Sequence, residues 1–117
     1  MSATATVTRA YKVLTASQMA QFQGDGRFTG APVDVDDGYI HLSDLQQLTG
    51  TVDRHFEGQD NLFVVAIDLD AVGAAVRWEP SRGGALFPHV YGDLAWAAVL
   101  AFEPLRRNTD GSVAVPA

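Results

Sequence analysis

The stretch LFVVAI, residues 62–67, decides the fold, because it is an unbroken apolar run rich in branched side chains. A run of this length and composition predicts a strand buried at the centre of a sheet. Further strands are predicted before and after it in the chain, at residues 9–14, 39–42, 76–78 and 99–102, with an edge strand at residues 113–115 that follows a hairpin turn at Asp110 and Gly111.

Two helices are predicted, and both precede the central run. Thr15 is a typical N-cap for a helix over residues 16–22, which Gly24 and Gly26 end. Ser43 is predicted to begin the second helix, because Gln46 completes a capping-box pattern before apolar residues at helical spacing. Since strands outnumber helices and the helices come early, the sequence predicts an α+β domain rather than a doubly wound parallel sheet.

The length of 117 residues corresponds to one domain. We expect a flexible N-terminus at residues 1–8, the domain at residues 9–105, and a C-terminal hairpin or tail at residues 106–117. Without cysteine the chain forms neither disulfides nor thiolate metal sites. No apolar run reaches the roughly 20 residues that span a bilayer, and the start MSATATVT lacks the features of a secretory leader. We therefore expect a cytoplasmic protein without a membrane partner.

The charge balance limits the class of partner. With 14 acidic and 8 basic side chains the formal net charge is −6, and the basic residues are scattered. Proteins that bind nucleic acid normally present a basic face or groove, so the composition argues against DNA and against RNA. One or two arginines could still hold a small phosphorylated ligand.

Two of the three histidines occupy positions that favour function. His41 lies one residue before the end of a predicted strand and close to a predicted helix start, where ligand groups often gather. His89 follows a proline in a Gly- and Pro-rich segment, whereas His55 is expected to pack at the edge of an apolar helix face. For His41 the alternative is a core histidine bonded to the backbone.

No metal site is predicted. The histidines are 14 and 34 residues apart and form no HExxH motif. The acidic segment DVDDG, residues 34–38, lacks the later ligands of a calcium loop and is predicted to be a solvated turn.

The segment WEPSRGGALFPHVYG, residues 78–92, is predicted to be a loop that forms one wall of a binding site, because it is too rich in glycine, proline and polar groups for a central strand. It offers a hydroxyl, a guanidinium, bare backbone, a carboxylate and aromatic rings at Ser81, Arg82, Gly83, Gly84, Glu79, Phe87 and Tyr91. Such groups suit a ligand with a phosphate, hydroxyls and a flat ring, as in a nucleotide. The alternative is a packed loop in which Arg82 pairs with Glu79 and the aromatic rings cap the core.

Three common catalytic or phosphate-binding motifs are absent: GxSxG, GxGxxG and the P-loop. Ser81, Glu79 and His89 are close in the sequence, which leaves a serine hydrolase as an alternative, although proximity along the chain does not establish the geometry of a triad.

Five motifs in order, YKVLT, GRF, DGYIHLS, HF and RWEPSRGGALFPHVYG, resemble a bacterial family known as domain-of-unknown-function family 952. The resemblance extends over residues 11–105. It implies the α+β split-sheet fold of the ADP-ribosyltransferases, which hold NAD in a cleft, although a fold alone does not define an activity.

A more distant resemblance links the chain to RNA 2′-phosphotransferases of that fold. YKVLT stands where those enzymes have YHGT, and the segment IHLS at residues 40–43 is similar to their HVHLS. The likeness implies that His41 lines a dinucleotide site with Ser43 beside it, and that Glu79 stands in for a catalytic glutamate. Lys12 replaces the first-strand histidine that helps to hold a ribose, and the glycine of YHGT is absent.

The sequence thus leads to a cleft that binds a nucleotide of the NAD or ADP-ribose type. If the protein is an enzyme, the resemblance implies glycosyl (ADP-ribosyl) transfer with His41 and Glu79 as catalytic residues and NAD as a substrate rather than a resident cofactor. The expected ligand-binding residues are Lys12, His41, Ser43, Ser81, Arg82, Gly83, Gly84, Phe87, His89 and Tyr91. Two alternatives remain open: a non-catalytic nucleotide-binding or sensor module, and a structural or interaction domain without a small ligand.

Overall fold

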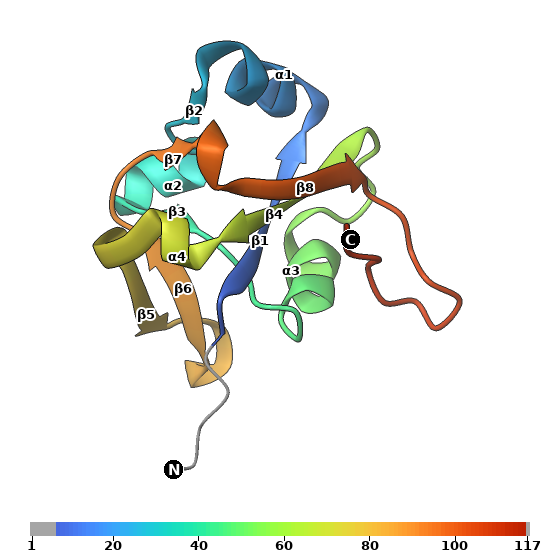
Figure 1. The fold of residues 1–117 in the computed structure, drawn as a ribbon. Coiled ribbons are helices and arrows are strands. Elements are labelled where there is room, and N and C mark those ends of the chain that lie inside the picture. Colours follow the sequence, from blue (N-terminus) through green and yellow to red (C-terminus); the bar gives the residue numbers. More distant parts are fainter. Residues whose placement is uncertain (1–6, 117) are drawn as a thin grey trace.

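The computed structural model describes residues 7–116, with the exception of the Arg82 side chain. The predicted central strand is confirmed. Strand β4 (Leu62–Asp68) pairs in antiparallel fashion with β1 (Arg9–Thr15) on one side and with β8 (Val99–Pro104) on the other (Figure 1). The expected N-terminal segment, residues 1–8, falls mostly outside the described residues.

Two further antiparallel sheets complete the strands. In one, β6 (Leu86–Val90) lies between β3 (Ile40–His41) and β5 (Val76–Pro80); in the other, β2 (Arg27–Phe28) pairs with β7 (Leu94–Ala95). An isolated bridge between Tyr11 and Ser43 connects the edge of β1 to the chain just after β3. The described chain is therefore one α+β domain with three small antiparallel sheets, which confirms the predicted class.

Four helices occur among the described residues: α1 (Ala16–Asp25), α2 (Pro32–Asp37), α3 (Leu48–His55) and α4 (Leu69–Val72), together with the 3-10 turns η1 (Gly73–Ala75), η2 (Arg82–Gly84) and η3 (Trp96–Ala98). The predicted cap of α1 is confirmed, because Thr15 Oγ1 accepts from the Gln18 N–H at 3.2 Å and Gln18 Oε1 accepts from the Thr15 N–H at 2.9 Å. None of the described helices is long and apolar enough to cross a membrane.

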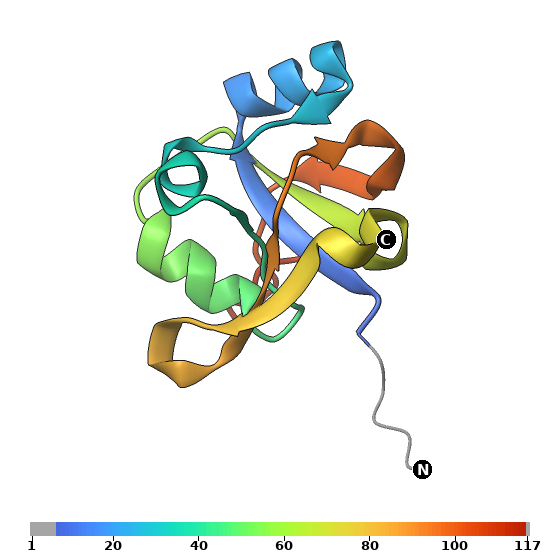
Figure 2. The same cartoon turned by 90° about the vertical axis from the view of Figure 1, so that its left-hand side faces the viewer.

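The alternation of side chains along β1 divides the core into two clusters. One cluster contains Ala10 and Leu14 with Met19 and Phe22 of α1, and the other contains Tyr11 and Val13 with Leu48 and Val52 of α3. Figure 2 shows α2 and α3 on the same side of β1. The edge of β1 that faces away from β4 therefore lies between these two helices.

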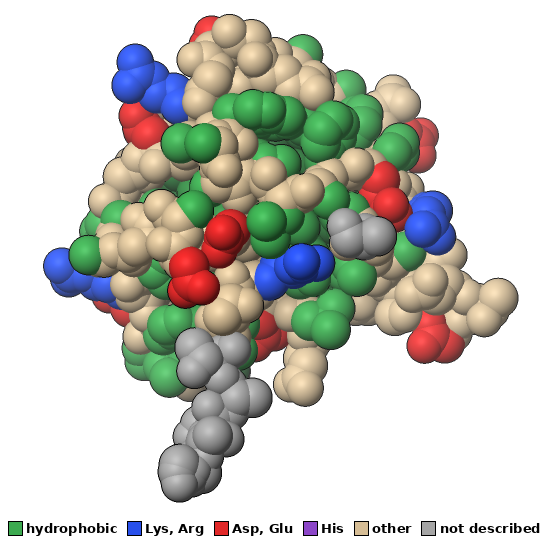
Figure 3. Space-filling view, in the orientation of Figure 1, with side chains coloured by type: hydrophobic (Ala, Val, Ile, Leu, Met, Phe, Trp, Pro, Cys, Tyr) green, Lys and Arg blue, Asp and Glu red, His purple; other side chains and the backbone are tan. Residues whose placement is uncertain are grey.

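Strand β8 is the other edge of the central sheet and exposes apolar side chains. Leu100 and Phe102 are both exposed, and the Phe102 ring lies edge-on to Trp96 at 5.5 Å between centroids. Figure 3 shows hydrophobic side chains gathered over this part of the molecule. Beyond β8 the chain returns toward α3, where the Val113 N–H donates to Thr49 Oγ1 at 2.9 Å. The predicted edge strand at residues 113–115 is reduced to a single bridge between Arg107 and Val113.

The predicted turn at residues 34–38 is wrong, because this segment belongs to helix α2. Pro32 occupies the first position of the helix, where its missing N–H costs nothing, and the Asp34 carboxylate accepts from the Ala31 N–H at 2.8 Å. Gly38 ends the helix with a φ of 89°, a left-handed conformation that favours glycine.

The predicted start of the second helix at Ser43 is also wrong, since α3 begins at Leu48. The Ser43 backbone pairs with Tyr11 instead, with N···O distances of 2.7 and 3.0 Å. Reciprocal bonds of 3.1 and 2.9 Å form one residue later, between Asp44 and Gln47. Tertiary pairing with β1 therefore overrides the local capping pattern.

The predicted loop at residues 78–92 is largely a hairpin of β5 and β6. Glu79 faces Phe87 and Arg77 faces His89 across the strand pair. His89 is therefore a strand residue, only 1% exposed, and not a loop residue. Proline is tolerated at position 88 because β3 ends at the pair of His41 and His89, so the missing N–H falls beyond the end of that strand.

Candidate functional site

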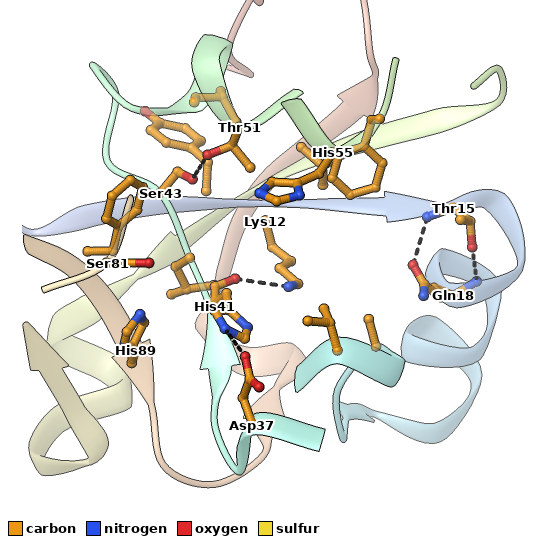
Figure 4. A pocket seen from close by; sticks show the side chains of 18 of the residues that line it. Lys12, Thr15, Gln18, Asp37, His41, Ser43, Thr51, His55, Ser81 and His89 are labelled. Carbon is orange, nitrogen blue, oxygen red and sulfur yellow. Dashed lines mark hydrogen bonds and ion pairs between the residues drawn. The ribbon is translucent and has the colours of Figure 1, made fainter. Parts of the chain in front are cut away.

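A cleft of about 570 Å³ lies across β1, between α2 and β3 on one side and α3 on the other. Figure 4 shows Lys12 extending from β1 toward His41, with Asp37 beside His41 and with Thr51 and His55 on the opposite side of the strand. The volume is within the range of roughly 300–1,000 Å³ that is typical of small-molecule sites. The lining also includes the aromatic side chains Tyr11, Phe56 and Phe87.

Six of the residues expected from the sequence line this cleft: Lys12, His41, Ser43, Ser81, Phe87 and His89. They come from the strands β1, β3 and β6 and from the segments that follow β3 and β5. Among the described residues, Glu79, Gly83, Gly84 and Tyr91 are not part of the lining. The side chain of Arg82 lies outside the described part of the chain, so its role stays a prediction.

Lys12 is buried, with 9% of its surface exposed, and its ammonium group is held from two directions. Nζ lies 3.0 Å from Asp34 Oδ2 and donates to the His41 carbonyl oxygen at 2.9 Å. Burial lowers the pKa of Lys12 from its usual value, and the adjacent Asp34 carboxylate opposes that shift. The lysine thus connects β1 to α2 and β3 at the floor of the cleft.

Asp34 organises this side of the cleft, although no local sequence pattern distinguishes it from a residue of a solvated turn. Its carboxylate accepts from the His41 N–H at 3.1 Å and lies 2.6 Å from His41 Nδ1, in addition to the bonds from Lys12 and the Ala31 N–H. Burial raises its pKa, but the His41 hydrogen bond, the Lys12 charge and the backbone donors together lower the pKa to about 2. Asp34 is therefore an anion at neutral pH.

Both ring nitrogens of His41 face carboxylates. Nδ1 lies 2.6 Å from Asp34 Oδ1, and Nε2 lies 2.9 Å from Asp37 Oδ2. Ionised carboxylates only accept hydrogen bonds, so both nitrogens can donate only when the ring is an imidazolium. A ligand that needed a free nitrogen of His41 would have to displace Asp37, which is the more exposed of the two carboxylates.

His89 is held differently. Its Nδ1 lies 2.8 Å from Glu79 Oε1, and the Tyr39 ring stacks on it at 4.1 Å between centroids with an interplanar angle of 23°. Its Nε2 is buried and has no hydrogen-bond partner in the described structure. Buried polar atoms are nearly always paired, so this nitrogen stands out as an acceptor beside the cleft that no described protein group uses.

Glu79 supports His89 from outside the cleft. The same Oε1 atom accepts from the Tyr91 hydroxyl at 2.7 Å, and the Arg77 guanidinium lies 4.9 Å from the Tyr91 ring centroid. The hydrogen bonds from His89 and Tyr91 hold the pKa of Glu79 below its usual value, and the carboxylate in turn raises the pKa of Tyr91. Glu79 and Tyr91 thus contribute to the site through His89.

Hydroxyl and backbone groups line the α3 side and the floor of the cleft. Ser43 Oγ and Thr51 Oγ1 are 2.8 Å apart. The backbone of Tyr11 pairs with Ser43, and the Thr15 N–H donates to Gln18, so both residues direct backbone groups away from β4. Backbone groups of alternate residues in a strand point to the same side, so the N–H and C=O of Val13 also point away from β4. They lie at the open edge of β1 in the cleft.

Several lining residues were not expected from the sequence: Thr15, Gln18, Asp37, Thr51 and His55. His55 was placed at the edge of an apolar helix face, and the structure brings that edge to the cleft. Asp37 could have been found from Pro32 and Gly38, which mark a short helix, but nothing local to the sequence brings Thr51 next to Ser43. Among the described residues no three His, Asp or Glu side chains could hold a metal ion together.

Solved structures with the same architecture exist for a bacterial relative. The crystal structure of protein CC0527 from Caulobacter crescentus has a TM-score of 0.83 and 38% identity, and the match covers 92% of this chain and 94% of that chain. The solution NMR structure of CC0527 has a TM-score of 0.76 and 38% identity, with 89% and 90% covered. No curated protein matches the chain.

The family comparison agrees with the sequence motifs. Residues 13–102 match the family described as "Protein of unknown function (DUF952)". This segment contains β3, β4, β5, β6 and most of the cleft lining. The chain belongs to the DUF952 family.

Proposed function

We propose that the cleft binds a small nucleotide of the NAD or ADP-ribose type. The observation that carries the proposal is the convergence of Lys12, His41, Ser43, Ser81, Phe87 and His89 on one cleft of about 570 Å³. A mostly apolar cavity with a few convergent polar groups is the usual form of a small-molecule site.

The two kinds of lining suit the two parts of a nucleotide. Tyr11, Phe56 and Phe87 provide aromatic surface for a base or a nicotinamide ring. The hydroxyl pair of Ser43 and Thr51, 2.8 Å apart, provides donors and acceptors for ribose hydroxyls. The positive charge of Lys12 is neutralised by Asp34. Lys12 therefore holds the elements of the site together and is not a free cation of the kind that a lone phosphate would need.

The open edge of β1 favours a ligand with a carboxamide. A carboxamide has one acceptor oxygen and an N–H₂ donor, which match the N–H and C=O that strand alternation directs into the cleft at Val13. Nicotinamide carries this group. The YHGT-like segment has no glycine here, but its residue Val13 lines the cleft.

The proposal includes the fold relationship that the motifs imply. In ADP-ribosyltransferase-like folds, two sheets separate around the dinucleotide site. Here the sheet β1–β4–β8 and the sheet β3–β6–β5 are joined at the bridge of Tyr11 with Ser43, and both of these residues line the cleft. This arrangement supports a split-sheet site, and CC0527 provides a second protein in which to look for it.

Catalysis would be glycosyl transfer at the ribose C1′, for which a carboxylate near the ribose stabilises the oxocarbenium character of the transition state. Glu79, the expected carboxylate, does not line the cleft and is engaged with His89 and Tyr91. This observation favours a non-catalytic nucleotide-binding module as the second candidate. Release of nicotinamide from NAD distinguishes the two, because only an enzyme produces it.

The direct test is thermal unfolding of the purified protein with and without millimolar NAD, ADP-ribose and nicotinamide. A ligand that binds only the folded state stabilises it by about 2.7 kcal/mol at one hundred times its dissociation constant. We expect a higher Tm with NAD or ADP-ribose. An unchanged Tm with all three ligands would refute the nucleotide proposal and favour a structural or interaction domain.

A further inference from the structure

The buried ring of His89 is fixed in position by its surroundings. It is 1% exposed, is stacked against Tyr39 at 4.1 Å, and pairs in register with His41 across β3 and β6. Its Nδ1 is bonded to Glu79, while its Nε2 has no hydrogen-bond partner. A buried ring with one anchored and one unpaired nitrogen, at the wall of a cleft, has an acceptor that no described protein group uses.

Glu79 determines which ring nitrogen carries the proton. An ionised carboxylate only accepts, so the neutral ring must donate from Nδ1 and keep a lone pair on Nε2. The Tyr91 hydroxyl donates to the same Glu79 oxygen at 2.7 Å and fixes the carboxylate. The hydrogen bonds from both partners lower the pKa of Glu79, which agrees with an ionised acceptor.

The other basic groups at the centre of the cleft are committed to internal partners. Both nitrogens of His41 face carboxylates, at 2.6 and 2.9 Å. The Lys12 ammonium lies against Asp34 and the His41 carbonyl oxygen. Compared with these two residues, His89 has an acceptor nitrogen that no described protein group uses.

We infer that His89 is the proton-accepting residue of the cleft, that Glu79 is its positioning residue, and that the ligand presents a hydroxyl group, or a water molecule bound with it, to Nε2. In the proton transfer the O–H bond breaks, its electron pair stays on oxygen, and an Nε2–H bond forms. The resulting imidazolium lies beside the Glu79 carboxylate, which stabilises its charge. This inference rests on the proposed function for the identity of the ligand, but the state of His89 is a property of the protein alone.

The first experiment therefore needs no ligand. In protein labelled with ¹⁵N-histidine, NMR at neutral pH distinguishes protonated from unprotonated ring nitrogens. We expect a protonated Nδ1 and an unprotonated Nε2 for His89. A proton on Nε2, whether or not Nδ1 is also protonated, would overturn the inference, because the nitrogen would then have no lone pair to accept a proton.

Two variants separate positioning from packing. In Glu79→Ala the carboxylate is removed, and we expect the fixed Nδ1–H tautomer of His89 to be lost. In Tyr91→Phe the carboxylate remains, and we expect the tautomer to be retained. If Glu79→Ala is folded and still has the wild-type tautomer, Glu79 is not the positioning residue. If Glu79→Ala does not fold, Tyr91→Phe still tests the arrangement. Loss of the Nδ1–H tautomer of His89 in that variant would contradict the arrangement.

The second experiment uses ADP-ribose as the probe. We expect it to shift the His89 Nε2 resonance, and we expect His89→Asn, which keeps an amide near the Nδ1 position but lacks Nε2, to bind it about tenfold more weakly, the scale of one hydrogen bond. Binding with an unchanged Nε2 resonance would refute the role of His89 but leave the proposed function intact. Absence of binding, with the expected tautomer in the free protein, would refute the nucleotide as ligand but not the pairing of Glu79 with His89.

Discussion

Glu79 Oε1 lies 2.8 Å from His89 Nδ1, although the two residues are ten positions apart in the chain. The contact depends on the pairing of β5 with β6, which brings the segments around Glu79 and His89 together. The concentration of polar and aromatic residues at 78–92 is therefore explained by a hairpin that backs the cleft with His89, rather than by a loop that presents all its side chains to a ligand.

A bulky side chain at Val33 is expected to block the cleft. Val33 lies on α2, lines the cleft and is 57% exposed, so Val33→Trp can be accommodated without disturbing the core. The indole would occupy space needed by a ligand, and we expect the affinity for ADP-ribose to fall by about tenfold or more, measured by calorimetric titration.

The matched control is Val35→Trp. Val35 is on the same helix, is 66% exposed and does not line the cleft. We expect this variant to bind ADP-ribose as the wild type does. Equal loss of affinity in both variants would indicate an effect on α2 as a whole and would contradict the proposed position of the ligand.

The open edge at Val13 leads to a prediction about the ligand rather than the protein. The carboxamide of NAD can both donate to the Val13 C=O and accept from its N–H, whereas the carboxylate of nicotinic acid adenine dinucleotide can only accept. We expect the carboxylate compound to bind about tenfold more weakly than NAD, because its negative charge would face a carbonyl oxygen. Equal affinities in competition titrations would show that the Val13 edge does not contact the nicotinamide.

Asp34→Asn should be strongly destabilising at neutral pH. The substitution removes the negative charge beside the buried Lys12 ammonium and replaces one of the two acceptor oxygens of Asp34 with an N–H₂ donor. Removal of one partner of a buried ion pair costs about 3–5 kcal/mol. Urea denaturation at neutral pH measures this loss, and Asp37→Asn, at the more exposed partner of His41, is the control with the smaller expected effect.

Ionisation of Asp34 is expected to make the stability of the folded protein depend on pH. The pKa of Asp34 is lowered from 3.8 to about 2 in the folded protein, so its stabilising contribution is complete above 3.8 and is lost as the pH falls toward about 2. The shift corresponds to about 2 kcal/mol, partly offset by the cost of burying Lys12, whose own pKa is lowered. The stability difference between wild type and Asp34→Asn should narrow across this window, and a constant difference would contradict the assignment.

Thr15→Ala should destabilise the protein by about 1 kcal/mol, because it removes the acceptor of the reciprocal cap at the start of α1. Ser17→Ala is the control, since Ser17 is exposed in the first turn of the same helix. A urea midpoint for Thr15→Ala as high as that of Ser17→Ala would mean that the cap contributes nothing to stability.

The parts of the fold that were predicted correctly have local causes. The apolar run at residues 62–67 forms the central strand, and Thr15 with Gln18 caps α1, because such patterns act within a few residues. Two of the wrong predictions, at Ser43 and in the segment around His89, concern residues whose backbone pairs with distant strands.

The residues of the site also divide into those that local sequence features identify and those that depend on long-range contacts. His41, Ser43 and His89 could be selected from residue type and from the family motifs. The importance of Asp34 could not, because it comes from burial and from contacts with Lys12, 22 positions away in the chain. Likewise, nothing in the sequence indicates that Glu79 bonds to His89 from outside the cleft, since this depends on the register of the hairpin.

The most direct test of the nucleotide-binding cleft is a titration of the ¹⁵N-labelled protein with ADP-ribose, followed through the backbone amide resonances. We predict saturable shifts that are concentrated at the cleft, including His41, Ser43 and Thr51, with little change at Leu100 on the exposed strand β8. No shift at millimolar ADP-ribose, or shifts centred on β8, would contradict the account.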